Sequence, residues 1–140
     1  MIINENLEAF NTLIRKINED EETNFNEITS SRKNHVCDVN LAMYSEDGNK
    51  NFQSFISSEL YRTNKGVVAF INSVYVSRIY GEDRYGAIII ENFIKEIKEN
   101  YKDCYIITSR VNEKDLPYFT DNGFVITSSN KNFYNVGMEL

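Results

Sequence analysis

The sequence predicts one α/β domain, residues 1–140, in which a mixed sheet of about six or seven strands carries helices on both faces. Strand-like apolar segments alternate with stretches of helical periodicity along the chain. The segment 67–76 is apolar at nearly every position, which is typical of a central strand covered on both faces. A helix and another strand follow it, the pattern of a parallel crossover. With 140 residues, 41% of them hydrophobic, the chain can form a core, which excludes a disordered protein.

The N-terminal region predicts a strand and two helices. Residues 1–4 fit a very short strand. Residues 5–19 fit an amphipathic helix because apolar residues recur at helical spacing, at Leu7, Phe10, Leu13, Ile14 and Ile17. After the acidic run 19–22, residues 23–33 predict a second helix with a weaker periodicity.

The rest of the chain predicts a hairpin, then the crossover, then a closing antiparallel pair. The polar stretch 45–50 is a turn, so we expect strands near 40–45 and 52–61 around it. Another turn ends at Gly66 and leads into the strand 67–76. The elements expected beyond it are a helix over 84–100, a strand over 104–108, a short helix over 113–121 that Gly123 ends, and strands over 124–127 and 133–138.

Composition and charge exclude several classes of function. The net charge of −6 disfavours nonspecific nucleic-acid binding, which needs clustered Lys and Arg, and mildly favours cationic partners. No apolar run reaches the roughly 20 residues that span a bilayer, and no signal peptide is visible, so we expect a cytoplasmic protein. Cys37 and Cys104 fit buried free thiols, with a disulfide or a reactive thiol as the alternatives. The lone His35 has no partners at ligand spacing, so we expect no metal.

The most informative segment is the junction 74–90, where an apolar strand passes through a short polar turn directly into an amphipathic helix. The first turn of a helix carries main-chain N–H groups without helical partners, and these attract anions, phosphates above all. The sequence at the junction therefore predicts a phosphate-binding turn.

These residues resemble the GNAT family of acyl-CoA-dependent N-acetyltransferases. The family has a strand ending in apolar-Tyr-Val, then Arg/Gln-x-x-Gly-x-Gly/Ala at the start of the helix. Val74-Tyr75-Val76 is similar to the strand end, and Gly81 to Gly86 lie in register with the loop. A second block agrees: Asn112 precedes Gly123-Phe124 by the family's eleven residues, with Tyr118-Phe119 between them.

The resemblance implies that acetyl-CoA is the acyl donor and lies where two parallel strands, here 67–77 and 104–109, splay apart. It implies an amine-bearing acceptor, in a peptide, a protein lysine or a small metabolite, and the chain could form a homodimer. The cofactor-binding residues that it implies are Val74, Tyr75, Val76, Gly81, Arg84, Tyr85, Gly86, Ala87 and Asn112. Among these, the main chain of Val74 and Val76 would hold the pantetheine arm, and Gly86 and Ala87 would let the phosphate approach closely.

The loop also departs from the family pattern. Gly81 stands where the family has Arg or Gln, and Arg84 stands at the first Gly, while Glu82 and Asp83 add negative charge. Two readings stay open here: Asp83 caps the helix with its own carboxylate, or Arg84 grips the phosphate with its guanidinium fork.

The residues that would carry the chemistry are less well defined. Phe119 occupies the register of the family's proton-donating Tyr, so Tyr118, one residue away, is the candidate acid, with an apolar packing role as the alternative. Glu59 is the nearest carboxylate for a general base, with a solvated surface residue as the alternative. The chain is therefore expected to be an N-acetyltransferase, or else a protein that keeps the fold, has lost the chemistry and acts through a protein partner.

Overall fold

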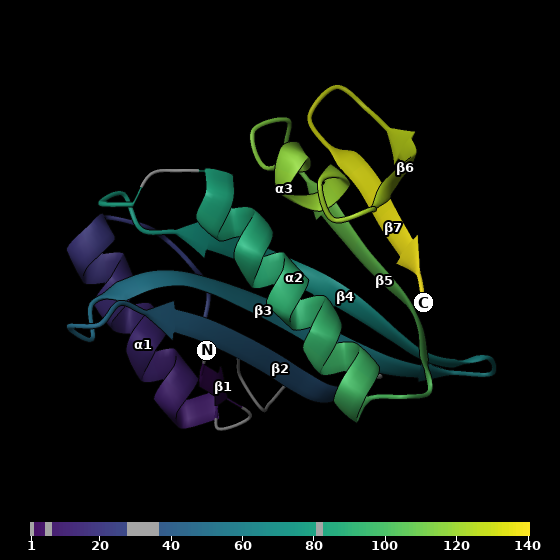
Figure 1. Cartoon of the computed structure of the whole chain (residues 1–140), viewed down its shortest axis with the longest axis horizontal. Helices are drawn as coiled ribbons and strands as arrows, with labels where there is room; N and C mark the ends of the chain where they lie inside the picture. Colours follow the sequence, from purple (N-terminus) through teal and green to yellow (C-terminus); the bar gives the residue numbers. More distant parts are fainter. Residues whose placement is uncertain (1, 5–6, 28–36, 81–82) are drawn as a thin grey trace.

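The computed structural model describes residues 2–4, 7–27, 37–80 and 83–140, and it forms one seven-stranded mixed sheet in the order β1-β2-β3-β4-β5-β7-β6 (Figure 1). The strands are β1 (Ile2–Asn4), β2 (Cys37–Glu46), β3 (Phe52–Thr63), β4 (Gly66–Val76), β5 (Cys104–Val111), β6 (Val125–Ser129) and β7 (Tyr134–Glu139). The helices are α1 (Leu7–Glu21), α2 (Asp83–Asn100) and α3 (Leu116–Thr120). β4 is the middle strand, as predicted.

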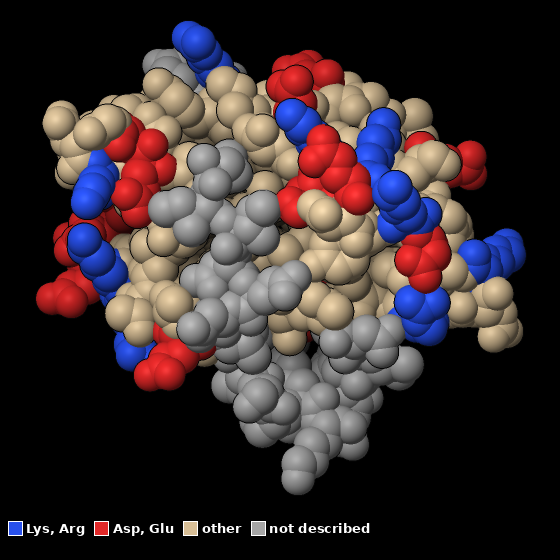
Figure 2. All heavy atoms as spheres, turned by 60° about the horizontal axis from the view of Figure 1, so that its bottom comes forward, with Lys and Arg blue, Asp and Glu red and all other residues tan. Residues whose placement is uncertain are grey.

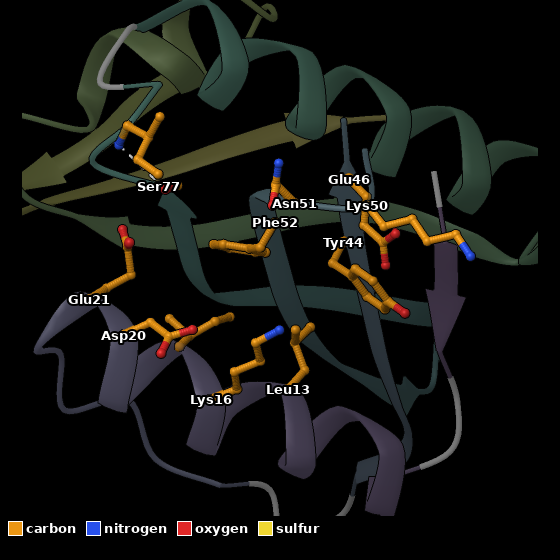
Figure 3. A pocket seen from close by; sticks show the side chains of 12 residues that line it. Leu13, Lys16, Asp20, Glu21, Tyr44, Glu46, Lys50, Asn51, Phe52 and Ser77 are labelled. Carbon is orange, nitrogen blue, oxygen red and sulfur yellow. Dashed lines mark hydrogen bonds between the residues drawn. The ribbon is translucent and has the colours of Figure 1, made fainter. Parts of the chain in front are cut away.

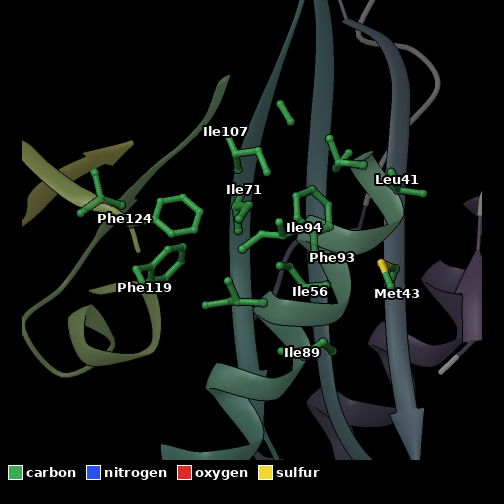
Figure 4. Close-up of a cluster of buried hydrophobic side chains, with 14 of the residues drawn as sticks. Leu41, Met43, Ile56, Ile71, Ile89, Phe93, Ile94, Ile107, Phe119 and Phe124 are labelled. Atoms are coloured by element: carbon green, nitrogen blue, oxygen red, sulfur yellow. The ribbon is translucent and has the colours of Figure 1, made fainter. Parts of the chain in front are cut away.

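The two faces of the sheet carry separate hydrophobic clusters, because successive side chains of a strand point to opposite faces. On one face, α1 packs Phe10, Ile14 and Ile17 against Ala42 and Phe55. On the other face, α2 packs against side chains that alternate with these, among them Leu41, Met43 and Ile56 (Figure 4). The prediction of helices on both faces is therefore confirmed.

The periodicity of α2 determines which of its sides is buried. Ile89, Ile90, Phe93 and Ile97 are fully buried, at the spacing expected of a helix that lies on a sheet. The helix connects β4 to β5, and these two strands pair in parallel, as the crossover pattern predicted. The position of α2 thus places its first turn beside the carboxyl end of β4 (Figure 1).

Some predicted elements differ from the structure. Residues 23–27 form irregular chain rather than the start of a helix, because Asn18 holds them: its side-chain amide bonds both the N–H and the C=O of Phe25. The remainder of the predicted helix 23–33 lies outside the described residues. The helix expected over 113–121 covers only Leu116–Thr120, because Asn112 and Asp115 form a turn before it.

Other predictions concern single residues. Gly123, three positions beyond the last residue of α3, has a positive φ of 91°, which is how a glycine ends a helix. Cys104 is a buried free thiol, and burial raises its pKa. The Cys37 side chain and His35 lie outside the described residues.

Within the described ranges, no group of three or more His, Cys, Asp or Glu could hold a metal ion, and no helix is long and apolar enough to cross a membrane.

Candidate functional site

β4 and β5 separate from one another halfway along the sheet. Their parallel pairing runs from Val67 opposite Cys104 to Ile71 opposite Ser109 and stops there, although β4 continues to Val76. Beyond this point β5 pairs only with β7, and Figure 1 shows the two strands diverging. We call this V-shaped opening the fork.

Two features define the closed end of the fork. The buried hydroxyl of Ser109 donates a hydrogen bond of 2.8 Å to the Ile71 carbonyl oxygen, which joins the last paired residues of the two strands. Directly after this, Asn72 is an extra residue in β4, because Ser57 and Ser58 of β3 pair with Ser73 and Ile71. Such a bulge bends a strand and redirects it, and here it turns β4 away from β5.

The β4 edge of the fork offers main-chain hydrogen-bonding groups. The N–H of Ser77 donates to the Gln53 carbonyl of β3 at 2.7 Å, so residue 77 faces β3. In an antiparallel pair, alternate residues point both N–H and C=O toward the partner strand. Tyr75 therefore also faces β3, while the main-chain groups of Val74 and Val76 point into the fork.

The fork contains two adjoining hollows of about 180 and 490 Å³. Both hollows contact Phe25, Val74, Asn112 and Asp115. The larger hollow, at the open end, also contacts Val76, Arg78, Lys114 and Tyr118. Strand edges, the irregular segment after α1 and the segment before α3 thus surround a single elongated opening.

Glu59 lies in a third hollow of about 280 Å³, which adjoins the fork through Phe25, Asn72 and Ser73. The side chain is only 5% exposed, and the Tyr61 hydroxyl donates a hydrogen bond to its carboxylate. The alternative of a solvated surface residue is therefore wrong. The structure brings Glu59 to the fork because β3 and the bulge of β4 are neighbours.

The start of α2 adjoins the larger hollow through Tyr118, whose ring covers Gly86, but none of Arg84, Tyr85, Gly86 and Ala87 lines either hollow of the fork. Arg84 is exposed, and the Tyr85 ring meets the Tyr80 ring edge to face, with 5.2 Å between the ring centres. Gly81, Glu82 and the Asp83 side chain lie outside the described residues, so both readings of the Asp83–Arg84 pair stay predictions. No described side chain accepts a hydrogen bond from the main chain of Arg84, Tyr85 or Gly86.

Several predicted site residues have structural contacts of their own. Tyr118 is 8% exposed, and its ring covers Gly86 so closely that a Cβ there would lie 2.6 Å from the ring carbons. The absence of a side chain at Gly86 thus admits this ring. The Asn112 side-chain oxygen accepts the Asp115 N–H at 2.8 Å, and the Ala87 carbonyl accepts a bond from Asn122 at 2.9 Å.

Phe119 and Tyr75 border the hollows of the fork and also pack against other aromatic rings. Phe119 is buried in the core with its ring edge-on to Phe124. The Tyr75 side chain lies on the α1 face among Phe25, Phe52 and Phe55.

Charged residues are mixed over the surface. In Figure 2, Lys and Arg alternate with Asp and Glu on the face shown, and the described residues there form no continuous basic stripe. A separate hollow of about 290 Å³ lies between α1 and the β2–β3 hairpin (Figure 3). It contacts Lys16, Asp20, Glu21 and Phe52, and it shares no residue with the hollows of the fork.

Comparisons with known proteins agree with this geometry. By sequence, no protein-family model and no curated protein matches the chain. By structure, it is similar to a GNAT-family acetyltransferase from Streptococcus pneumoniae, with a TM-score of 0.65 and 14% identity over 99% of both chains. The chain has the GNAT fold.

Two further GNAT-fold structures are similar. A chimera of the spermidine N-acetyltransferase SpeG from Vibrio cholerae with hSSAT has a TM-score of 0.66 and 15% identity over 99% of this chain and 96% of the other. The N-acetyltransferase PseH from Campylobacter jejuni, in complex with acetyl coenzyme A, has a TM-score of 0.56 and 17% identity over 96% and 82%. The likeness extends over nearly the full length of this chain in each case.

Within this GNAT fold, sequence reasoning missed three residues that border the fork. Arg78 and Lys114 place two cations at the open end, and Asp115 lies between the two hollows. Burial raises the pKa of Asp115, against the opposing effects of Lys114 and Asn112. Arg78 stands within the informative junction itself, whereas only the packing of α3 brings Lys114 and Asp115 to the same opening.

Proposed function

We propose that the protein is an acetyl-CoA-dependent N-acetyltransferase that transfers an acetyl group to a primary amine. The observation that carries this proposal is the fork, in which β4 presents the main-chain groups of Val74 and Val76 without a partner strand. A pantetheine arm carries amide groups, and it can pair with these main-chain groups as an added strand would.

The charges along the opening support this orientation of the donor. Arg78 and Lys114 lie at the open end, next to the first turn of α2, where they and the helix N-terminus would attract a diphosphate. Glu59 lies in the hollow that adjoins the closed end of the fork. The carboxylate of Glu59 would attract an ammonium group to the closed end, and the two cations would attract phosphate to the open end.

The same geometry supports roles in chemistry. Acetyl-CoA supplies an activated thioester, and the protein has to hold a neutral amine against it. Glu59 is the carboxylate placed to accept the proton that the amine loses, directly or through water. Tyr118 lines the larger hollow, which continues through Val74 into the smaller one, and its phenol is the candidate to return a proton to the departing thiolate.

Titration calorimetry with acetyl-CoA tests the proposal. We expect a Kd below about 1 mM for the wild type, and weaker binding by Lys114→Ala because a cation next to the phosphates is lost. Lys98→Ala is the matched control, since Lys98 lies in the last turn of α2, away from the fork. An absence of binding at millimolar acetyl-CoA would contradict the proposed function.

A second candidate is a GNAT-fold binding protein that has lost the chemistry and acts through a protein partner. The observation that favours it is Phe119, which occupies the register of the family's proton donor and is buried in the core. Release of free thiol from acetyl-CoA in the presence of a panel of amines distinguishes the two. Binding without thiol release supports the second candidate.

A further inference from the structure

The carboxylate of Glu21, the last residue of α1, binds two groups at the end of β4. Its Oε1 atom accepts the Tyr75 hydroxyl and the Arg78 main-chain N–H, both at 2.8 Å. Figure 3 shows Glu21 pointing from α1 toward the end of β4 at Ser77. One side chain thus connects α1 to the strand end that leads into the α2 turn.

The hydroxyl end of this connection is held firmly. The Tyr75 ring lies 5.0 Å from the Phe25 ring and 6.0 Å from the Phe55 ring, centre to centre. It also stacks nearly parallel to Phe52. The phenol therefore has a fixed direction, and Glu21 is oriented by it.

The interaction favours the ionised carboxylate. Burial alone would raise the pKa of Glu21, but the hydrogen bonds from Arg78 and Tyr75 outweigh it, so the pKa is lowered. A charged carboxylate is a stronger acceptor than a neutral one, which strengthens both bonds at neutral pH.

The other end of the connection is a residue of the fork. The main chain of Arg78 is bonded to Glu21, while Arg78 itself lines the open end of the fork together with Lys114 and Tyr118. The main chain of a residue sets the direction in which its side chain leaves the backbone. Fixing the Arg78 amide therefore limits where its guanidinium can lie.

We propose that Glu21 is a positioning residue for the acyl donor, a role that rests on the proposed function. By holding the Arg78 amide, it keeps the Arg78 guanidinium over the open end of the fork, where the phosphates of acetyl-CoA bind. Glu21 itself contacts neither donor nor acceptor. It acts on the affinity for the phosphate-bearing part of the donor and leaves the affinity for the pantetheine arm unchanged.

The test compares two ligands on three proteins. Acetyl-CoA carries the phosphates, and S-acetylpantetheine lacks them. Calorimetry is run on the wild type, on Glu21→Ala and on Glu19→Gln, which removes the same charge from an exposed position on the same helix. We expect Glu21→Ala to weaken acetyl-CoA binding about tenfold and to leave S-acetylpantetheine unaffected, while Glu19→Gln changes neither.

A second variant keeps the result interpretable if Glu21→Ala unfolds. Tyr75→Phe retains the ring but removes one donor to Glu21, and we expect about a threefold weaker affinity for acetyl-CoA alone. Equal losses for both ligands, or no difference between Glu21→Ala and Glu19→Gln, would overturn the positioning role while leaving the enzyme proposal intact. A wild type that binds neither ligand overturns the proposed function and this role with it.

Discussion

The ring of Tyr118 lies directly on Gly86, so that α3 packs against the first turns of α2 without a side chain between them. Asn122 reinforces the contact, because its amide donates to the carbonyls of both Ala87 and Tyr118. This contact fixes the distance between the two helices that flank the open end of the fork.

Gly86→Ala should therefore destabilise the protein by about 1–3 kcal/mol, because the new Cβ forces the Tyr118 ring aside. The better helix propensity of Ala offsets at most about 1 kcal/mol of this. Urea unfolding measures the change. Gly48→Ala is the control, since a Cβ there meets nothing within 4 Å. If the strain comes from the ring, Gly86→Ala combined with Tyr118→Ala will be less destabilising than the sum of the two.

Ser109→Ala should cost about 1–3 kcal/mol and also weaken acetyl-CoA binding, because it leaves the Ile71 carbonyl without its donor at the closed end of the fork. Ser58→Ala is a matched control: the buried Ser58 hydroxyl donates to the Leu41 carbonyl at the same 2.8 Å, but between β2 and β3. We expect both variants to lose similar stability, and only Ser109→Ala to bind acetyl-CoA more weakly. If Ser109→Ala and Ser58→Ala bind acetyl-CoA with equal affinity, the hydrogen bond between Ser109 and Ile71 does not shape the site.

Glu59→Gln should lower the rate of amine acetylation by about 100-fold or more at neutral pH, because a neutral amide cannot accept the proton of the amine. The affinity for acetyl-CoA should stay unchanged, and the loss should shrink at high pH, where free amine is abundant. Glu27→Gln serves as the control because Glu27 borders the same hollow but is exposed and paired with Arg15. If Glu59→Gln acetylates amines at the wild-type rate, Glu59 is not the general base.

Tyr118→Phe should reduce turnover while retaining the affinity for acetyl-CoA, because the ring that covers Gly86 remains and only the hydroxyl group is lost. Steady-state kinetics with thiol detection measures the split between kcat and KM. Tyr105→Phe, which removes a hydroxyl 3.4 Å from Thr63 at the other end of β5, is the control. An unchanged kcat would leave Tyr118 with a packing role only.

Alkaline pH should destabilise the protein through Tyr75. Burial, and then the hydrogen bond to Glu21, raises the pKa of Tyr75 to about 12. In the unfolded chain the phenol titrates near about 10, so the folded state holds its proton more tightly. The stability that this contributes is complete below about pH 10 and is lost as the pH rises toward 12. Thermal unfolding at a series of pH values should show a steeper decline for the wild type than for Tyr75→Phe.

The sequence alone determined the elements and their order. The buried stripe of α2 and the nearly continuous apolar run of β4 are local patterns. The first is sufficient to predict a helix on a sheet, and the second a central strand. The main-chain edge at Val74 and Val76 was also predicted, through the resemblance of the strand end to a known family. The irregular segment 23–27 was not, because a single side chain, Asn18, overrides its local propensity.

Only the tertiary structure decided which side chains meet. Glu59 comes to a hollow that adjoins the fork because β3 lies beside the bulge of β4, and Arg78 and Lys114 line the same hollow because α3 folds back toward α2. A side chain at Gly86 would collide with the ring of Tyr118, which is 32 residues further along the chain. Periodicity reports which way a side chain faces within its own element. The neighbour that it meets there depends on how distant elements pack, and no local pattern encodes that.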